Sequence, residues 1–219
     1  MDYIKIKIVF LQSKLKLLLF FVFLFFFCTK PSSLLAQGAD AYYKNGLFKY
    51  HIRDYDGALA DFNKTVEISP VYEKVYDKRG LIKYRLEDYR GAIEDFSQTI
   101  RFFPDDINAF YFRGLSKMNI LDYEGALMDF EKVLDFDPYN ELAIVKSGNV
   151  KYQQEKFQEA IELYSKVILQ NQNNGEALFY RGMAKYKLGD TKEGCVDLDL
   201  ANKLEYIEAY DEFVESMCN

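Results

Sequence analysis

The sequence predicts an all-α protein, built as a solenoid of five stacked helix pairs with a capping helix at the C-terminal end. A glycine recurs every 34 residues, at Gly46, Gly80, Gly114, Gly148 and Gly182. An alanine follows each of the first four glycines by 12 residues, and Gly194 takes that place in the fifth copy. A fixed period of this length indicates one supersecondary unit that is copied and stacked. Such copies bury a continuous core together and leave an extended surface that suits binding.

Residues 1–36 precede the repeats and have the layout of a secretory signal peptide. Four lysines, Lys5, Lys7, Lys14 and Lys16, come first, and an unbroken apolar run of 12 residues follows from Leu17 to Cys28. Small and polar residues come next, which is the three-part pattern of an export signal. The run is short for a membrane span, which needs about 20 apolar residues. We therefore expect cleavage near Ala36, with an uncleaved membrane anchor as the alternative.

The charge of the chain argues against nucleic acid and anionic lipid as partners. Loss of residues 1–36 removes five lysines and one aspartate, which changes the formal net charge from −6 to −10. Nucleic acids and anionic membranes are bound through basic patches. Most of the 19 Phe and 18 Tyr of the chain lie in the remaining domain, residues 37–219, and can supply it with a large core. We expect this domain to stay out of the membrane after cleavage.

Each repeat reads as two helices and covers residues 39–72, 73–106, 107–140, 141–174 or 175–208. With each repeat numbered from 1 to 34, positions 4, 8 and 11 share one face of a first helix, and positions 20, 24 and 27 share one face of a second. Glycine at position 8 and alanine at position 20 leave room for the two helices to approach. Aromatic residues at positions 4 and 24 fill the space beside that contact.

The ends of the second helices are also marked in the sequence. Position 16 holds Asp54, Asp88, Asp122 and Asp190, which suit the N-cap of a helix. Asp190 and Glu193 form a capping pattern of the Asp-x-x-Glu type. Position 32 holds Pro70, Pro104 and Pro138, which stop the second helix. Because repeats 4 and 5 have Gln172 and Tyr206 there, we expect looser ends or another route for the chain.

The unit resembles the tetratricopeptide repeat (TPR). The resemblance is carried by an aromatic residue at position 4, Gly at 8, an aromatic at 17, Ala at 20, Phe at 24 and Pro at 32, and it covers residues 39–208. It implies antiparallel helix pairs in a right-handed superhelix that acts as a scaffold for protein–protein contacts. Thr191 and Gly194 depart from the pattern in the last repeat, where atypical capping units are expected. Residues 207–217 read as the capping helix.

In that family, first-helix residues at positions 2, 5, 9, 12 and 13 line the concave face. The resemblance therefore implies an aromatic and apolar partner-binding strip of Tyr43, Leu47, Tyr50, Leu81, Tyr84, Tyr111, Leu115, Met118, Tyr152, Phe179, Met183 and Tyr186. A strip of this kind marks a binding surface when it is exposed. The alternative is that the position-12 side chains pack between neighbouring repeats. The basic clamp of TPR proteins that bind chaperone tails is not reproduced.

Charged side chains also follow the repeat. Position 11 is lysine in all five repeats, at Lys49, Lys83, Lys117, Lys151 and Lys185. These lysines either form a basic ladder for a partner or cover the helix pair with their stems while the ammonium groups reach solvent. Arginine at position 7 and aspartate at position 23 occur together in repeats 2, 3 and 5, and both are absent from repeat 4. This joint occurrence predicts ion pairs between the two helices of a repeat.

Cys195 and Cys218 are the two cysteines that remain after signal cleavage. Cys195 lies early in the second helix of repeat 5, and the capping helix places Cys218 on the side that faces this helix. The run GDTKEGC with a cysteine at the C-terminal end also resembles other exported bacterial TPR proteins. An exported protein can form disulfides. We therefore predict a Cys195–Cys218 disulfide, with two free cysteines as the alternative.

The sequence as a whole favours a non-enzymatic, exported scaffold, periplasmic or secreted, that holds a partner protein or peptide in its concave face. A permanent accessory subunit of a cell-envelope assembly or secretion complex is the alternative. An enzyme that uses acidic groove residues is the third reading. The one histidine, His51, fits a surface imidazole, and the sequence has no phosphate-binding loop, dinucleotide turn or metal-ligand cluster. We expect no cofactor, metal, catalytic residue or small-molecule substrate.

Overall fold

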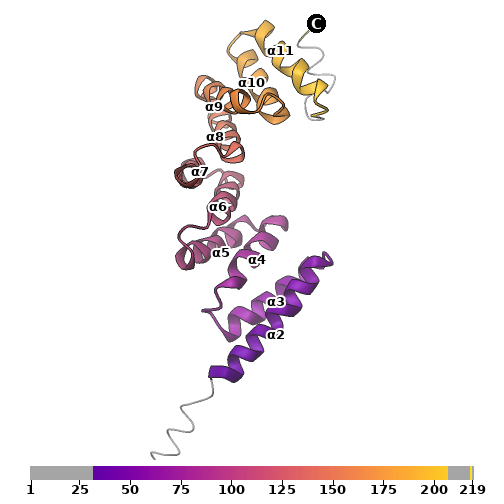
Figure 1. Ribbon diagram of the computed structural model, residues 1–219, viewed down its shortest axis with the longest axis vertical. Coiled ribbons are helices and arrows are strands. Elements are labelled where there is room, and N and C mark those ends of the chain that lie inside the picture. The colour runs from indigo at the N-terminus through magenta and orange to yellow at the C-terminus, as the bar shows by residue number, and fades with distance from the viewer. Residues whose placement is uncertain (1–31, 207–217, 219) are drawn as a thin grey trace, which may run out of the picture. The chain divides into compact units, whose positions relative to one another are not determined.

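The structure is a computed structural model that describes residues 32–206 and residue 218, with side chains from residue 37. Within those residues it consists of helices joined by short turns, without strands (Figure 1). The first helices of the repeats are α2 (Ser32–His51), α4 (Lys74–Arg85), α6 (Ile107–Asn119), α8 (Glu141–Gln153) and α10 (Gly175–Lys187). The second helices are α3 (Tyr55–Ile68), α5 (Tyr89–Phe102), α7 (Tyr123–Phe136), α9 (Phe157–Gln170) and α11 (Thr191–Lys203). The predicted all-α solenoid of five helix pairs is confirmed, while the signal segment up to residue 31 and the capping helix at 207–217 lie outside the described residues.

The chain divides into two compact units, residues 1–75 and 76–219. The described part of the first unit is the pair α2 and α3, in which the ring of Phe62 lies across Gly46. Phe48 on α2 is 65% exposed. The equivalent position 10 is fully buried in later repeats, at Ser116, Val150 and Ala184. The α2 helix therefore leaves open a face that the later first helices have covered.

In the second unit each first helix packs on its second helix through the glycine at position 8. A Cβ atom on Gly114 would lie 2.7 Å from Cε1 of Phe130, so only glycine fits beneath that ring. In the last pair the ring is replaced by Leu198, and a Cβ on Gly182 would lie 2.8 Å from the backbone oxygen of Gly194. The two departures in repeat 5, Leu198 at position 24 and Gly194 at position 20, therefore act together. The smaller side chain and the second glycine let α10 and α11 approach more closely.

Three of the four predicted aspartate caps are formed. The carboxylate of Asp122 accepts a 3.0 Å hydrogen bond from the backbone N–H of Gly125, and Asp54 and Asp88 make the same bond. Asp190 stands at the N-cap of α11 but makes no side-chain capping bond, so the predicted Asp-x-x-Glu cap is wrong. In the first three repeats the capped residue is a glycine, and Glu193 stands at that place in α11.

Proline is not needed to end a second helix. The α9 helix stops at Gln170, 34 residues after α7 stops, although position 32 of this repeat is Gln172. Asn171 and Asn174 each donate a 3.0 Å side-chain hydrogen bond to Oε2 of Glu141. Asn174 also caps α10 by accepting from the N–H of Ala177 at 2.9 Å. Asparagine side chains therefore hydrogen-bond across this turn, and the helix ends in register without a proline.

Candidate partner-binding surface

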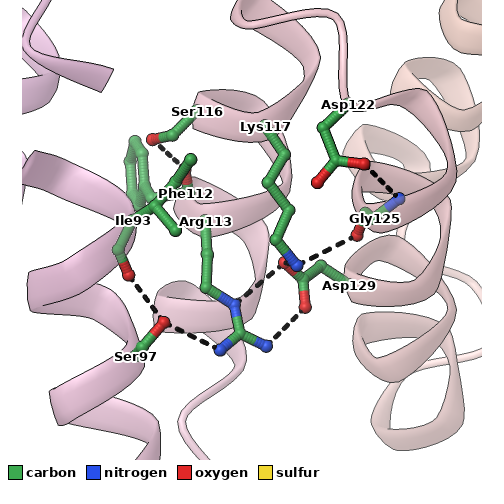
Figure 2. A network of polar contacts seen from close by, with 9 residues as sticks. All are labelled: Ile93, Ser97, Phe112, Arg113, Ser116, Lys117, Asp122, Gly125 and Asp129. Atoms are coloured by element: carbon green, nitrogen blue, oxygen red, sulfur yellow. Dashed lines mark hydrogen bonds and ion pairs between the residues drawn. The ribbon is translucent and has the colours of Figure 1, made fainter. Parts of the chain in front are cut away.

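The charged residues that follow the repeat bind one another between the helices. In repeat 3, Nε and Nη2 of Arg113 donate to the carboxylate of Asp129 at 3.0 and 2.6 Å, as the sequence predicts (Figure 2). Nη1 of Arg113 donates to Oγ of Ser97 on the preceding helix, α5, at 3.1 Å. Asp129 is 2% exposed, so this network is internal. Repeats 2 and 5 make the same arginine–aspartate pair.

The position-11 lysines belong to this network as well. Nζ of Lys117 lies 2.8 Å from Oδ2 of Asp129 and donates to the carbonyl of Gly125 at 3.3 Å (Figure 2). In repeat 4, where position 23 is leucine, Lys151 pairs instead with Glu159 at 2.7 Å. The ammonium groups therefore tie the two helices of a repeat together. Neither sequence-based reading, a ladder for a partner or heads reaching solvent, describes them.

The residues predicted to line the partner-binding strip lie on the first helices, but they are less exposed than a free groove requires. Leu115 is buried. The others are half-buried: Tyr43, Leu47, Tyr50, Leu81, Tyr84, Tyr111, Met118, Tyr152, Phe179, Met183 and Tyr186. Within the second unit, α6 and α8 contact each other, as do α8 and α10. We call the surface of α4, α6, α8 and α10 the first-helix face.

The position-12 tyrosines pack between neighbouring repeats. The ring centroid of Tyr84 lies 5.6 Å from that of Tyr89 in the same repeat and 5.9 Å from that of Phe112 in the next. Tyr152 makes equivalent contacts, at 5.4 Å with Phe157 and 6.0 Å with Tyr180. Burial raises the pKa of both hydroxyls above the usual value. These two rings therefore pack between neighbouring repeats and are only partly exposed.

A polar cluster interrupts the aromatic surface between repeats 4 and 5. Oε1 of Glu176 on α10 accepts from Nζ of Lys146 at 2.6 Å and from Nδ2 of Asn149 at 3.0 Å, both on α8. The hydroxyl of Tyr164 on α9 donates to Oδ1 of Asn149 at 2.8 Å. Burial raises the pKa of Tyr164. Sequence reasoning did not select this cluster, although the signal was present as departures of repeat 4 from the other repeats.

The hydroxyl of Tyr111 on α6 is influenced by this cluster. Burial, and then the nearby charge of Glu176, raises the pKa of Tyr111 to about 12. Its ring stacks edge-on against Phe112 with the centroids 5.5 Å apart. Aromatic rings and a carboxylate therefore come together on the first-helix face of repeats 3 to 5.

The structure joins Cys195 and Cys218 by a disulfide, with their Cα atoms 5.6 Å apart. This distance is within the usual range of about 4.4–6.8 Å. The bridge ties the C-terminal end of the chain to α11.

Within the described part of the chain, no three His, Cys, Asp or Glu side chains are grouped so that they could hold a metal ion. His51, the one histidine, is exposed on α2. None of the described helices has the length and apolar character that crossing a membrane requires.

Two family descriptions match the C-terminal part of the chain: "TPR repeat" at residues 148–189 and "Tetratricopeptide repeat" at residues 176–216. No curated protein matches the sequence.

Solved structures with the same fold are numerous. MamA from Desulfovibrio magneticus RS-1 is 19% identical with a TM-score of 0.71, over 77% of this chain and 96% of that one. YrrB, described as a TPR protein with an unusual peptide-binding site, is 17% identical with a TM-score of 0.66, over 79% of this chain and 87% of that one. A TPR protein from Parabacteroides merdae is 15% identical with a TM-score of 0.70, over 83% and 71% of the two chains. The sequence matches at residues 148–216 and the fold shared with these structures together support a tetratricopeptide repeat protein.

Proposed function

We propose that this TPR scaffold is a non-enzymatic, exported protein that holds a partner protein or peptide on its first-helix face. The observation that carries the proposal is the polar cluster around Glu176, set among half-buried aromatic and aliphatic side chains. Polar groups that fix orientation within an apolar surface are typical of binding sites. The position-12 rings support the same proposal in a different way, because they make the surface rigid before a partner arrives.

Two further observations fit a peptide partner. YrrB, which shares the fold, is described as having a peptide-binding site. Tyrosine and methionine at positions 5, 9 and 12 combine large contact area with adaptability. Export is proposed from the basic leader and apolar run of residues 1–36, with a periplasmic or secreted destination and an uncleaved anchor as the alternative.

Exposed apolar side chains on the second helices give the alternative function a physical basis. Met128 on α7 is 66% exposed, and Val196 and Leu200 on α11 are also exposed. A permanent subunit of an envelope assembly would use these side chains instead of the first-helix face. The two functions therefore place the partner on different helices of the same repeats.

Two methionines of repeat 3 separate these functions. Met118 lies half-buried on the first helix α6, and Met128 lies exposed on the second helix α7. We would purify wild type, Met118→Lys and Met128→Lys from the native envelope fraction with their cross-linked partners. A lysine stem can follow the path of a methionine and carry its charge to the surface. Circular dichroism and thermal unfolding of the three proteins show whether the fold is retained.

The proposal expects wild type and Met128→Lys to capture the same partner, and Met118→Lys to lose it. The opposite pattern, in which only Met128→Lys loses the partner, would establish the permanent-subunit function. Equal yields from all three proteins would contradict both surfaces.

A further inference from the structure

Because the five repeats share one numbering, equivalent positions can be compared, and repeat 4 departs from the others in its polar residues. Position 9 is leucine in the first three repeats and Asn149 in the fourth. Position 24 is phenylalanine in the first three and Tyr164 in the fourth. The internal arginine–aspartate pair is replaced by Ser147 and Leu163. Repeat 4 therefore lacks the internal ion pair of repeats 2, 3 and 5 and has two polar side chains that those repeats lack. This difference suggests that its polar residues serve a purpose other than joining the two helices.

The new polar groups converge on one carboxylate. The buried Tyr164 hydroxyl holds Asn149, and Asn149 and Lys146 both donate to Oε1 of Glu176. Two donors therefore fix the orientation of Glu176 through a single oxygen. Oε2 of Glu176 receives no hydrogen bond from any of the residues described. The side chains of Lys146 and Glu176 are 22% and 24% exposed, so the cluster is open to a partner.

Glu176 is already paired with Lys146 through Oε1, and Oε2 leaves acceptor sites for a second cation. Phe179 lies three residues after Glu176 on α10, which places it on the neighbouring surface of the helix. Tyr111 on α6 is close enough for the charge of Glu176 to raise its pKa. Lysine and arginine bind well where a carboxylate and aromatic faces combine. The net charge of −6 for the chain, or −10 without residues 1–36, adds a long-range attraction for basic segments.

We propose that Glu176 binds a lysine or arginine side chain of the partner, on the first-helix face of repeats 3 to 5. Asn149 and Tyr164 are positioning residues that hold Glu176 in place. This inference rests on the proposed function, because it names the chemistry of the partner segment that the face receives.

The test is a selection of displayed random peptides on the immobilised full chain. Peptides enriched on wild type should carry a lysine or arginine beside aromatic or aliphatic residues. An enriched peptide should bind Glu176→Gln at least about tenfold more weakly than wild type, since hydrogen bonds to charged groups contribute about 1.5–3 kcal/mol. Glu162→Gln is the matched control, because Glu162 is exposed on the second helix α9.

A second measurement tests the positioning residues. Tyr164→Phe removes only the hydroxyl that holds Asn149, and it should weaken the enriched peptide. It should leave unchanged the weaker binding of the same peptide with norleucine in place of its basic residue. Equal weakening of both peptides would show that Tyr164 acts on the fold alone and would overturn its assignment as a positioning residue.

The outcomes distinguish a failure of the inference about Glu176 from a failure of the proposed function. If peptides are enriched and Met118→Lys abolishes their binding, but Glu176→Gln binds them as tightly as wild type, the inference about Glu176 is overturned and the proposed function stands. Enrichment of peptides without any basic residue would have the same consequence. If no peptide is enriched, or if Met118→Lys binds the peptides unchanged, the proposed function is overturned together with the inference.

Discussion

At position 15 of every repeat the backbone between the two helices adopts a left-handed conformation. The φ angles are positive at Arg53, Glu87, Leu121, Glu155 and Gly189. Only the last of these is a glycine, the residue that adopts such angles without steric cost. At the other four, the N–H of the next residue donates to the carbonyl of the position-11 lysine, which closes the first helix. Without a glycine at these positions, the sequence did not reveal this feature of the turn.

Substitution of Gly189 measures the free-energy cost of a left-handed backbone conformation without other contacts being changed. Its φ is +93°, and a Cβ atom there would meet nothing within 4 Å. Gly189→Ala should therefore lower the free energy of unfolding by about 1 kcal/mol through backbone conformation alone. Gly189→Asn should lose about half as much, because asparagine tolerates this region better. Urea denaturation measures both, and equal losses would contradict the explanation.

Tyr111 should give the protein a distinct response to alkaline pH. Its folded-state pKa is about 12, because burial and the charge of Glu176 oppose ionisation. An unfolded tyrosine has a pKa of about 10. Since the folded state holds the proton more tightly, the contribution of Tyr111 to stability is complete below pH ~10 and is lost as the pH rises through ~12.

Tyrosinate absorbance checks this expectation, and the absence of tryptophan from the chain simplifies the spectrum. Tyr111→Phe should remove one late-ionising group and flatten the fall in stability above pH ~10. Tyr42→Phe is the control, because Tyr42 is exposed on α2. If both variants titrate alike, Tyr111 does not have the pKa described.

At the level of helices and their contacts, the arginine–aspartate–lysine network joins the two helices of a repeat. Asp129→Leu should destabilise the protein by about 3 kcal/mol, because it leaves Arg113 and Lys117 without their internal carboxylate. The double variant Arg113→Ser with Asp129→Leu reproduces the residues of repeat 4, Ser147 and Leu163. It should cost clearly less than the sum of the two single changes. A double-mutant cycle in urea measures this coupling, and strict additivity would exclude it.

The helices and many of the contacts between them were predictable from the sequence, because periodicity is a strong signal for repeated helices. The spacing of glycine and alanine gave the helix pairs, and the joint occurrence of arginine and aspartate gave their ion pairs. The caps of the first helices were missed: Asp106, Asn140 and Asn174 lie at position 34, in a turn that was read only for proline. Asp190 stands at the same repeat position as the aspartates that cap, yet it forms no side-chain cap.

The candidate site was predictable only in part, for a related reason. The resemblance placed residues on the first helices correctly but could not show how deeply each is buried. Tyr84 and Tyr152 pack against the next repeat, and this contact depends on how neighbouring repeats fit together in three dimensions. The cluster around Glu176 joins residues from three helices, α8, α9 and α10. Reading each repeat for departures from the others would have marked Asn149 and Tyr164 in advance.

For the molecule as a whole, the disulfide is the one covalent link between distant parts of the chain that the described residues contain. It closes a separation of 23 residues between Cys195 and Cys218. Replacement of both cysteines by serine should lower the free energy of unfolding by about 3 kcal/mol in the chain-entropy model. Wild type in reducing buffer should behave like this variant. Proteolysis should begin at the C-terminal end of both, because end repeats open first.

Thiol counting provides the control for this prediction. Protein isolated without reductant should contain no titratable thiol at Cys195 or Cys218. Two reactive thiols, or a serine variant as stable as wild type, would contradict the prediction.

The exposed Phe48 and the disulfide of α11 give the array two unlike ends. Phe48 is exposed at a position that is fully buried in later repeats, whereas Cys195 in the last repeat is bonded to Cys218. An engineer who wishes to lengthen the protein should therefore graft new repeats ahead of α2. The graft should include Phe48→Val, because Val150 is fully buried at the same position of repeat 4. A graft beyond α11 would in contrast have to keep or replace the bond that ties Cys218 to Cys195.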